Sequence, residues 1–492
     1  MKPRAFLASI VLQRHDSRQR RTSLQAQLYT ELKKRLGAGI LRPGDPLPSS
    51  RDLASDLGVS RNTAIAVYDR LIGEGYLEPR PRSGLYVNEA LLPAKAPLRT
   101  QPPAAAALPP AETRRVGPAP FRPCQPDVRL FPLALWNRLR TRVLRAQGTA
   151  LLHYQPAAQT LGLPALRRAL AAYLRDSRGV QCTWEQVAVT AGSQQALFLL
   201  GQLLLRPGDT AIMEDPGYLG AREAWRRAGA VVKPLPADAG GLVAPGAAAC
   251  AGAKLVYTTP SRQFPTGACL PVAGRQALIE SARRAGAWIV EDDYDSEFRY
   301  TRPPMPSLHG LDPERRVIYL GTMSKVLAPS LRIGYMVLPE PLVEDFAALR
   351  MAADDHGPTV DQATLAEFID SGSFYTHIRR CRNEYARRQE AFLKSVAAAG
   401  LPLEFPHRDG GMNLAGFAEP GTDDRAWSAT LAAGGLDVPA LSYYALDPAA
   451  PRSPRGLLFG FTAFEPAAIR HAVRLAAGSL RRAGSGSRPG RA

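Results

Sequence analysis

The first ninety residues carry apolar side chains at the spacing of helices. The first helix has a leucine at every fourth position: Leu24, Leu28, Leu32 and Leu36. This spacing puts the leucines on one face and predicts an amphipathic helix over 23–37. Ser49 and Asp52 have the spacing of a capping box, so a second, short helix is expected to start there and to end at Gly58.

A third helix and a hairpin follow. Ser60 can cap a helix whose apolar residues fall at i, i+3, i+4, i+7 and i+8: Ala64, Val67, Tyr68, Leu71 and Ile72. Two apolar runs, 76–78 and 85–87, flank the basic turn 79–84 and read as a hairpin. Three helices followed by a basic hairpin predict an α+β winged helix-turn-helix domain over 1–90.

Downstream, the pattern changes to short apolar runs that alternate with helical segments. The runs are 187–190, 210–213, 254–257, 288–290 and 317–320. Apolar strands separated by helices predict an α/β domain with a mostly parallel sheet covered on both faces. Each run ends in a polar cluster, and ligands bind at the carboxyl ends of strands in such sheets. We assign this second domain to 121–483.

The segment between the two domains has a different composition. Residues 91–120 contain eight Pro and eight Ala without an amphipathic period, which predicts an extended linker. Residues 484–492 are rich in Gly, Ser and Arg and are expected to form a disordered tail. The chain is therefore predicted to be a multidomain protein.

Charge and cysteine content limit the class of protein. The chain has 62 Lys+Arg against 44 Asp+Glu, a net charge of +18, which favours a polyanionic partner such as nucleic acid over an acidic membrane surface. Its five cysteines show no zinc or disulfide spacing, and no apolar run is long enough to span a membrane. The apolar stretch 5–12 lacks a cleavage site, so we expect a cytoplasmic protein.

The third helix is the expected DNA reader. An α-helix fits the major groove, and the residues of its first turn reach base edges, where Arg pairs with guanine and Asn with adenine. We expect the DNA-binding residues to be Arg51, Ser60, Arg61, Asn62, Thr63, Arg80, Arg82 and Gly84. The alternative is a protein-interaction helical domain with a solvated charged face. The basic hairpin and the net charge favour DNA.

The N-terminal segment resembles the GntR superfamily of bacterial regulators. The motifs that carry the resemblance occur in order at 47–54, 58–63, 74–77 and 83–87. The resemblance spans about residues 22–88 and implies double-stranded operator DNA as a partner.

The polar clusters of the second domain suit one cofactor. A phosphate would be held by the start of a helix, by hydroxyls and by a guanidinium: Gly192, Ser193, Gln194, Thr322, Ser324 and Arg332. Lys325 is placed to form an imine with an aldehyde, and Asp292 to pair with a pyridine nitrogen. Tyr294 can hydrogen-bond a ring hydroxyl, and Tyr218 can stack on a ring. Each residue alone has an ordinary structural explanation, but together they describe pyridoxal 5'-phosphate.

This second domain resembles the fold-type I aminotransferases that depend on pyridoxal phosphate. The segments 291–300 and 321–335 carry the likeness, and nearly the whole chain resembles the MocR subfamily of GntR regulators. The resemblance implies Lys325 as the catalytic Schiff-base lysine. It also implies a head-to-tail, domain-swapped homodimer, in which Tyr154 reaches the phosphate of the neighbouring subunit.

The chain departs from the family pattern at two residues and in the loop between Tyr154 and Gly162, which is slightly long. Arg262 stands where the family usually has His. In the segment 456–461, Leu457 takes the place of the arginine with which aminotransferases grip the substrate carboxylate.

Three functions remain open from the sequence. The first is a DNA-binding regulator that senses pyridoxal phosphate, or a small amine or amino acid that forms an imine with it. The second is a metabolic aminotransferase with an accessory DNA-binding domain. The third is a DNA-binding protein whose large domain has lost the cofactor. The complete winged-helix pattern argues against the second, and the intact set around Lys325 and Asp292 argues against the third.

Overall fold

The computed structural model describes residues 10–12, 23–90, 119–243, 246, 248–301, 305–447 and 453–485. The chain divides into two compact units, Met1–Arg114 and Arg115–Ala492. The predicted linker lies outside the described residues except for 119–120, and so does the tail from 486. The last helix continues to Ser485, so residues 484–485 of the expected tail are helical.

The N-terminal unit is a winged helix-turn-helix, as predicted. Its helices are α1 (Leu24–Gly37), α2 (Ser50–Leu57) and α3 (Arg61–Gly73). Each begins at a serine whose side chain accepts a hydrogen bond from the backbone N–H three residues on, at Ser23, Ser49 and Ser60. Leu28, Leu32, Leu53, Ala64, Val67 and Leu71 meet in one core. The apolar stripes of the helices therefore build this unit.

The wing has one strand more than the sequence predicted. The strands β2 (Leu77–Arg80) and β3 (Gly84–Val87) form the expected hairpin, and β1 (Pro46–Leu47) pairs antiparallel with the free edge of β3. Two residues are too few to show a strand period, so only the tertiary pairing reveals β1.

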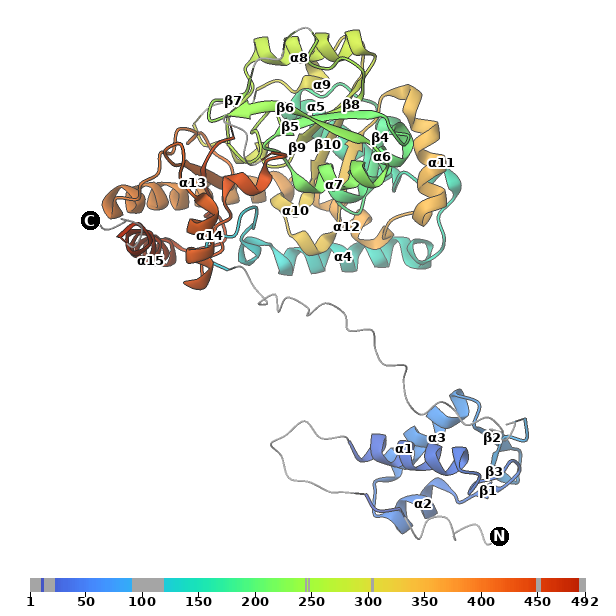
Figure 1. Cartoon of the computed structure of the whole chain (residues 1–492). Coiled ribbons are helices and arrows are strands. Elements are labelled where there is room, and N and C mark those ends of the chain that lie inside the picture. Colours follow the sequence, from blue (N-terminus) through green and yellow to red (C-terminus); the bar gives the residue numbers. More distant parts are fainter. Residues whose placement is uncertain are drawn as a thin grey trace. The chain divides into compact units, whose positions relative to one another are not determined.

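The large unit is built on an eight-stranded mixed sheet in the order β4-β11-β10-β9-β8-β5-β6-β7 (Figure 1). The strands are β4 (Val187–Thr190), β5 (Thr210–Asp215), β6 (Val231–Asp238), β7 (Gly241–Leu242), β8 (Ala253–Thr258), β9 (Trp288–Asp293), β10 (Val317–Thr322) and β11 (Gly334–Val337). The pairs from β6 to β10 are parallel, and β11 is antiparallel to both β10 and β4. The sheet is mostly parallel, as predicted.

Both faces of this sheet are covered. Alternate residues of β10 join different core clusters: Tyr319 packs in one with Leu170, and Leu320 in another with Leu197. The helices of this part are α4 (Leu133–Gln147), α5 (Pro164–Arg178), α6 (Ser193–Leu204), α7 (Leu219–Arg227), α8 (Val272–Ala285), α9 (Leu308–Leu311), α10 (Met323–Val326), α11 (Val343–Asp354) and α12 (Thr359–Asp370).

A smaller subdomain completes the large unit. It contains α13 (Ser373–Ala399), the antiparallel pair β12 (Asn413–Phe417) and β13 (Gly456–Gly460), α14 (Asp424–Ala433) and α15 (Pro466–Ser485). Its core surrounds Phe392 and Phe459 and also takes in Phe121, which follows directly after the predicted linker. No helix of the described part of the chain is long and apolar enough to cross a membrane.

Candidate functional site

The last two residues of β9, Asp292 and Asp293, face opposite sides of the sheet. Asp292 accepts a hydrogen bond from the Tyr257 hydroxyl at 2.8 Å through Oδ2. Asp293 is paired with Arg178 at 2.5 Å and accepts the Tyr319 hydroxyl at 2.5 Å. Both carboxyls are buried and leave Oδ1 without a hydrogen bond. Asp293 already has a cation, so Asp292 is the carboxyl that still lacks one.

Burial changes the acidity of Asp292. Removal from water raises its pKa from an ordinary value of 3.8 to about 7, and the Tyr257 hydrogen bond works against this shift. A protonated ring nitrogen against Oδ1 would supply the missing hydrogen bond and the missing positive charge.

Lys325 lies on α10, directly after β10. Its Nζ donates a hydrogen bond to the carbonyl oxygen of Cys124 at 3.0 Å. Thr322, the last residue of β10, caps α10 by accepting a hydrogen bond from the Ser324 N–H at 3.1 Å. The cap holds the start of α10 in place and thereby fixes where the lysine side chain leaves the backbone.

The start of α6 forms a cradle for an anion. Gly192 caps this helix with φ 97°, a conformation in which a side chain is strained, and a Cβ there would lie 3.1 Å from Nη2 of Arg332. Arg332 donates to the Ala191 carbonyl at 2.5 Å. Because Gly334 lacks a side chain, β11 passes close to the start of α6, where Ser193 is the first residue. A guanidinium and a helix N-terminus therefore meet at one point.

Aromatic side chains border the same region. The ring of Phe264 makes edge contacts with Tyr218, Tyr294 and Tyr444, with centroids 6.1, 5.9 and 5.0 Å away. Burial raises the pKa of Tyr294 well above its ordinary range, so its hydroxyl stays protonated. Tyr218 donates to Gln194 Oε1 at 3.2 Å, which ties the aromatic side chains to the anion cradle.

Tyr154 lies apart from these residues within the chain. The residue is 88% exposed, and its ring lies edge-on to the His356 ring with the two ring centroids 6.1 Å apart. The predicted contact of Tyr154 with the phosphate of a second subunit stays a prediction.

The residues present fit pyridoxal phosphate. The free Oδ1 of Asp292 suits the pyridine nitrogen, the Gly192–Arg332 cradle suits the phosphate, and Lys325 suits the aldehyde. Tyr257 and Cys124 were not predicted. Tyr257 ends a predicted strand, so its place at a strand end was a usable signal, whereas nothing in the sequence places Cys124 beside a lysine 201 residues away.

The structure corrects one assignment on β13. Leu457 is not the residue that faces the cofactor region, because it packs with Phe121 and Phe459 in the core of the smaller subdomain. Its neighbour Leu458 lies on the other face of the strand and packs with Phe264 beside Tyr218 and Tyr294. Side chains alternate along a strand, so an assignment wrong by one position selects the wrong face.

The expected DNA-reading residues lie at the start of α3 and on the wing. Arg61 and Asn62 are exposed in the first turn of α3, Thr63 is half-buried, and Ser60 is the cap. Arg51 is exposed on α2. Arg82 and Gly84 form the tip of the hairpin with positive φ angles of 61° and 113°.

Arg80 differs from the other expected DNA contacts. It pairs with Glu78 at 2.7 Å and with Glu89 at 2.6 Å, and its guanidinium lies over the Tyr86 ring. Of the arginines expected to contact DNA, it is the one that already has carboxylate partners among the residues described.

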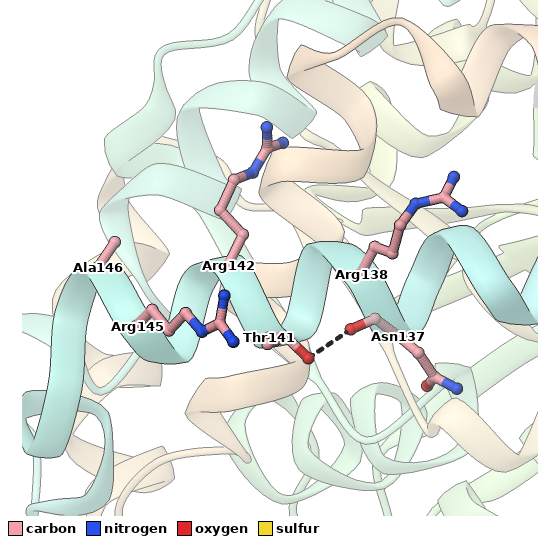
Figure 2. A pocket seen from close by; sticks show the side chains of 6 residues that line it. All are labelled: Asn137, Arg138, Thr141, Arg142, Arg145 and Ala146. Carbon is pink, nitrogen blue, oxygen red and sulfur yellow. Dashed lines mark hydrogen bonds between the residues drawn. The ribbon is translucent and has the colours of Figure 1, made fainter.

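The large unit has a basic surface of its own on α4. This helix contains four arginines and no acidic residue. Figure 2 shows the side chains of Arg138, Arg142 and Arg145 along α4. They line a pocket of about 760 Å³, and Arg142 forms an ion pair with Glu367. Positive charge is therefore not confined to the N-terminal unit.

Comparisons with known proteins agree with this arrangement. Residues 24–87 match the model of bacterial regulatory proteins of the gntR family, and residues 139–453 match that of aminotransferase class I and II. The chain is 37% identical to the probable rhizopine catabolism regulatory protein MocR of Rhizobium meliloti, over 92% of each chain. It is 33% identical to the pyridoxine biosynthesis transcriptional regulator PdxR of Corynebacterium glutamicum, over 91% of this chain and 94% of that one.

A solved structure gives the same result for the large unit. The multiple substrate aminotransferase of Thermococcus profundus matches with a TM-score of 0.67 and 26% identity, over 75% of this chain and 92% of that one. Fold and site together define a DNA-binding winged helix joined to an aminotransferase-type domain of fold type I. The chain belongs to the MocR subfamily of GntR-type transcriptional regulators. It is a transcriptional regulator whose cofactor is pyridoxal phosphate.

Proposed function

We propose that this regulator binds operator DNA as a homodimer and that its DNA affinity responds to pyridoxal phosphate or to an amine or amino acid that reacts with it. The observation that carries the proposal is the complete cofactor set of Lys325, Asp292 and Arg332 in a chain that also has an exposed reading turn on α3. Because its target is chromosomal DNA, we propose that the protein works in the cytoplasm.

Each residue of the set has a part in holding the cofactor. Arg332 and the N–H groups at the start of α6 bind the phosphate, together with the hydroxyls of Ser193, Thr322 and Ser324. Asp292 keeps a proton on the ring nitrogen, and Tyr294 donates to the ring oxygen. Tyr218 stacks on the ring. The cofactor supplies an aldehyde that condenses reversibly with primary amines.

The position of Lys325 offers a route from this site to the DNA-binding unit. Its ammonium donates to the carbonyl of Cys124, four residues after the predicted linker 91–120. With pyridoxal phosphate bound, Lys325 would hold the aldehyde, and a lysine displaced by an amine would be free to make this contact. The cofactor site therefore acts on the segment that leads into the linker.

The segment around Cys124 is held firmly at both sides. The Asp437 N–H donates to the Pro120 carbonyl at 2.8 Å, and Asn413 Oδ1 accepts from the Cys124 N–H at 2.6 Å. Segment 120–124 is thus attached to the smaller subdomain and, through Lys325, to the end of β10. Loss or gain of the hydrogen bond from Lys325 to Cys124 therefore changes how strongly this segment is held to the end of β10, while its hydrogen bonds to the smaller subdomain stay in place.

Dimerisation converts this change into an effect on DNA. The two winged helices of a dimer must match the spacing of two half-sites on the DNA. A modest reorientation of the large domains therefore changes the affinity of the dimer for operator DNA. We propose the head-to-tail arrangement, with the winged helix of each chain on the large domain of the other. The exposure of Tyr154 supports the dimer itself, because this side chain is available to contact a second chain.

Operator binding tests the proposal directly. Fluorescence anisotropy with labelled operator DNA at fixed salt would compare the apoprotein, the protein with pyridoxal phosphate, and the same protein with added amines. Linkage predicts a coupling of about 1–3 kcal/mol between effector and DNA, equal in both directions. Unchanged DNA affinity in all three states would contradict sensing.

Asn413→Ala tests the route through Cys124. It removes the side chain that holds the Cys124 N–H, so cofactor and DNA should still bind while the effector loses most of its influence on DNA affinity. Asn137→Ala, on the exposed face of α4, is the matched control and should leave the coupling intact. Sedimentation velocity tests the dimer, and a monomer at micromolar concentration would contradict it.

A further inference from the structure

The side of the cofactor region formed by β13 is apolar. Leu458 is buried against Phe264, and its cross-strand neighbour Ala415 belongs to the same cluster. Cys124, whose carbonyl accepts the Lys325 ammonium, packs there too. The apolar surface therefore reaches the lysine with which an effector amine must exchange. We call Phe264, Ala415, Leu441 and Leu458 the apolar wall.

The nearby cations already have partners. Arg332 lies in the anion cradle and donates to the Ala191 carbonyl. Arg262 is buried, donates to the Asn413 carbonyl at 2.5 Å and lies 3.6 Å from Asp295. Its guanidinium also fills the space beside Gly411, where a Cβ would collide with it. Arg262 is therefore neutralised and held in place.

Arg455 does not replace the missing arginine either. It lies 3.7 Å from the buried Asp424, which accepts hydrogen bonds from the Ser442 hydroxyl and N–H. Asp424 and Arg455 thus form a structural pair within the smaller subdomain. Arg262 and Arg455 therefore each lie within 4 Å of a carboxylate, whereas the hydrophobic cluster that contains Leu458 is made of apolar and aromatic side chains.

We propose that the effector is a primary amine that carries no carboxylate next to its amino group, and that its body lies against Phe264 and Leu458. This inference rests on the proposed function. A carboxylate placed at the apolar wall would lose its hydration without gaining a cation as partner, which is unfavourable. An uncharged apolar group at the same place would be removed from water and would pack against apolar side chains, which is favourable. The site thus selects for amines by excluding the charge that amino acids carry.

Two matched pairs of probes test the inference in wild-type protein. 2-Phenylethylamine and L-phenylalanine differ by one carboxylate, and so do isoamylamine and L-leucine. Full-length protein loaded with pyridoxal phosphate is titrated with each compound at pH 8. The visible absorbance of the cofactor and the melting temperature are read, and each affinity is divided by that of the same compound for free pyridoxal phosphate. We expect each amine to bind at least ~10-fold more tightly than its amino acid.

Leu458→Arg supplies the missing cation. It should tighten binding of L-phenylalanine at least ~10-fold and weaken binding of 2-phenylethylamine, whereas the control Leu458→Met should keep the wild-type preference. If Leu458→Arg does not fold, Arg262→His, which puts in the residue usual in the family, takes its place. The proposal expects this change to leave the ratio between amine and amino acid as it is.

The possible outcomes separate the two proposals. Amino acids that bind as tightly as their amines in the wild-type protein would overturn the inference and leave amine sensing intact. Amino-acid binding that is lost in Arg262→His would also overturn it and would name Arg262 as the carboxylate ligand. If no compound of either kind changes the absorbance or the melting temperature, amine sensing itself is wrong, and the inference falls with it.

Discussion

Tyr257→Phe is expected to weaken cofactor binding without touching the cofactor. The substitution removes the hydroxyl that donates to Asp292 Oδ2 at 2.8 Å and leaves the ring in place between the sheet and Trp225, whose ring centroid is 5.9 Å away. Asp292 is buried, so no water replaces the lost donor. The substitution destabilises the ionised form of Asp292 more than the protonated form, and the ionised form is the one that would pair with the ring nitrogen.

The magnitude follows from the charge on the acceptor. A hydrogen bond to a charged group contributes about 1.5–3 kcal/mol, and each 1.4 kcal/mol is a factor of ten in affinity. The dissociation constant of pyridoxal phosphate should therefore rise about 10- to 150-fold. The pKa of Asp292, already about 7, should rise further, because the Tyr257 hydrogen bond is what lowers it.

The assay is an equilibrium titration of apoprotein with pyridoxal phosphate at pH 7.5, followed by visible absorbance. Tyr319→Phe is the matched control, because it removes a hydroxyl that donates to Asp293 on the opposite face of the sheet. It should lower the melting temperature and keep the affinity within about threefold of wild type. Wild-type affinity in Tyr257→Phe, or an equal loss in both variants, would refute the role assigned to Asp292.

Four further predictions concern the cofactor and the DNA. Lys325→Ala should abolish the visible absorbance that survives dialysis after reloading while leaving the fold intact, and persistent absorbance would contradict its role. Arg61→Ala should cost about 1–3 kcal/mol of specific operator binding in gel shifts at fixed salt, and unchanged affinity would mean that α3 does not enter the groove. Gly192→Ala should strain a backbone with φ 97° and push against Arg332, so pyridoxal phosphate should wash out on dialysis. The raised pKa of Asp292 should make the apoprotein lose stability as the pH rises from about 4 to about 7, because the unfolded carboxyl ionises first. Asp292→Asn should reduce that loss in urea titrations at pH 5 and pH 8, and an identical pH dependence would contradict it.

The sequence alone determined the helices of the N-terminal unit, five strands of the large sheet and the order of the cofactor-binding residues along the chain. Leucines at helical spacing and serine caps fixed α1 and α3, because a 3.6-residue period and a local hydrogen bond need no distant partner. The sequence also predicted that Asp292 and Lys325 lie near each other, because parallel strands bring their carboxyl ends to one edge of the sheet. Class and cofactor followed from these local signals.

Only the tertiary structure decided which side chains meet. The hydrogen bond from Tyr257 to Asp292 depends on the register between β8 and β9, and the contact from Lys325 to Cys124 closes a loop of 201 residues. The choice between Leu457 and Leu458 depended on which face of β13 turns toward Phe264. Residues adjacent in sequence point to opposite faces of a strand, so burial in the folded chain, and not the motif, decides which one lines the site.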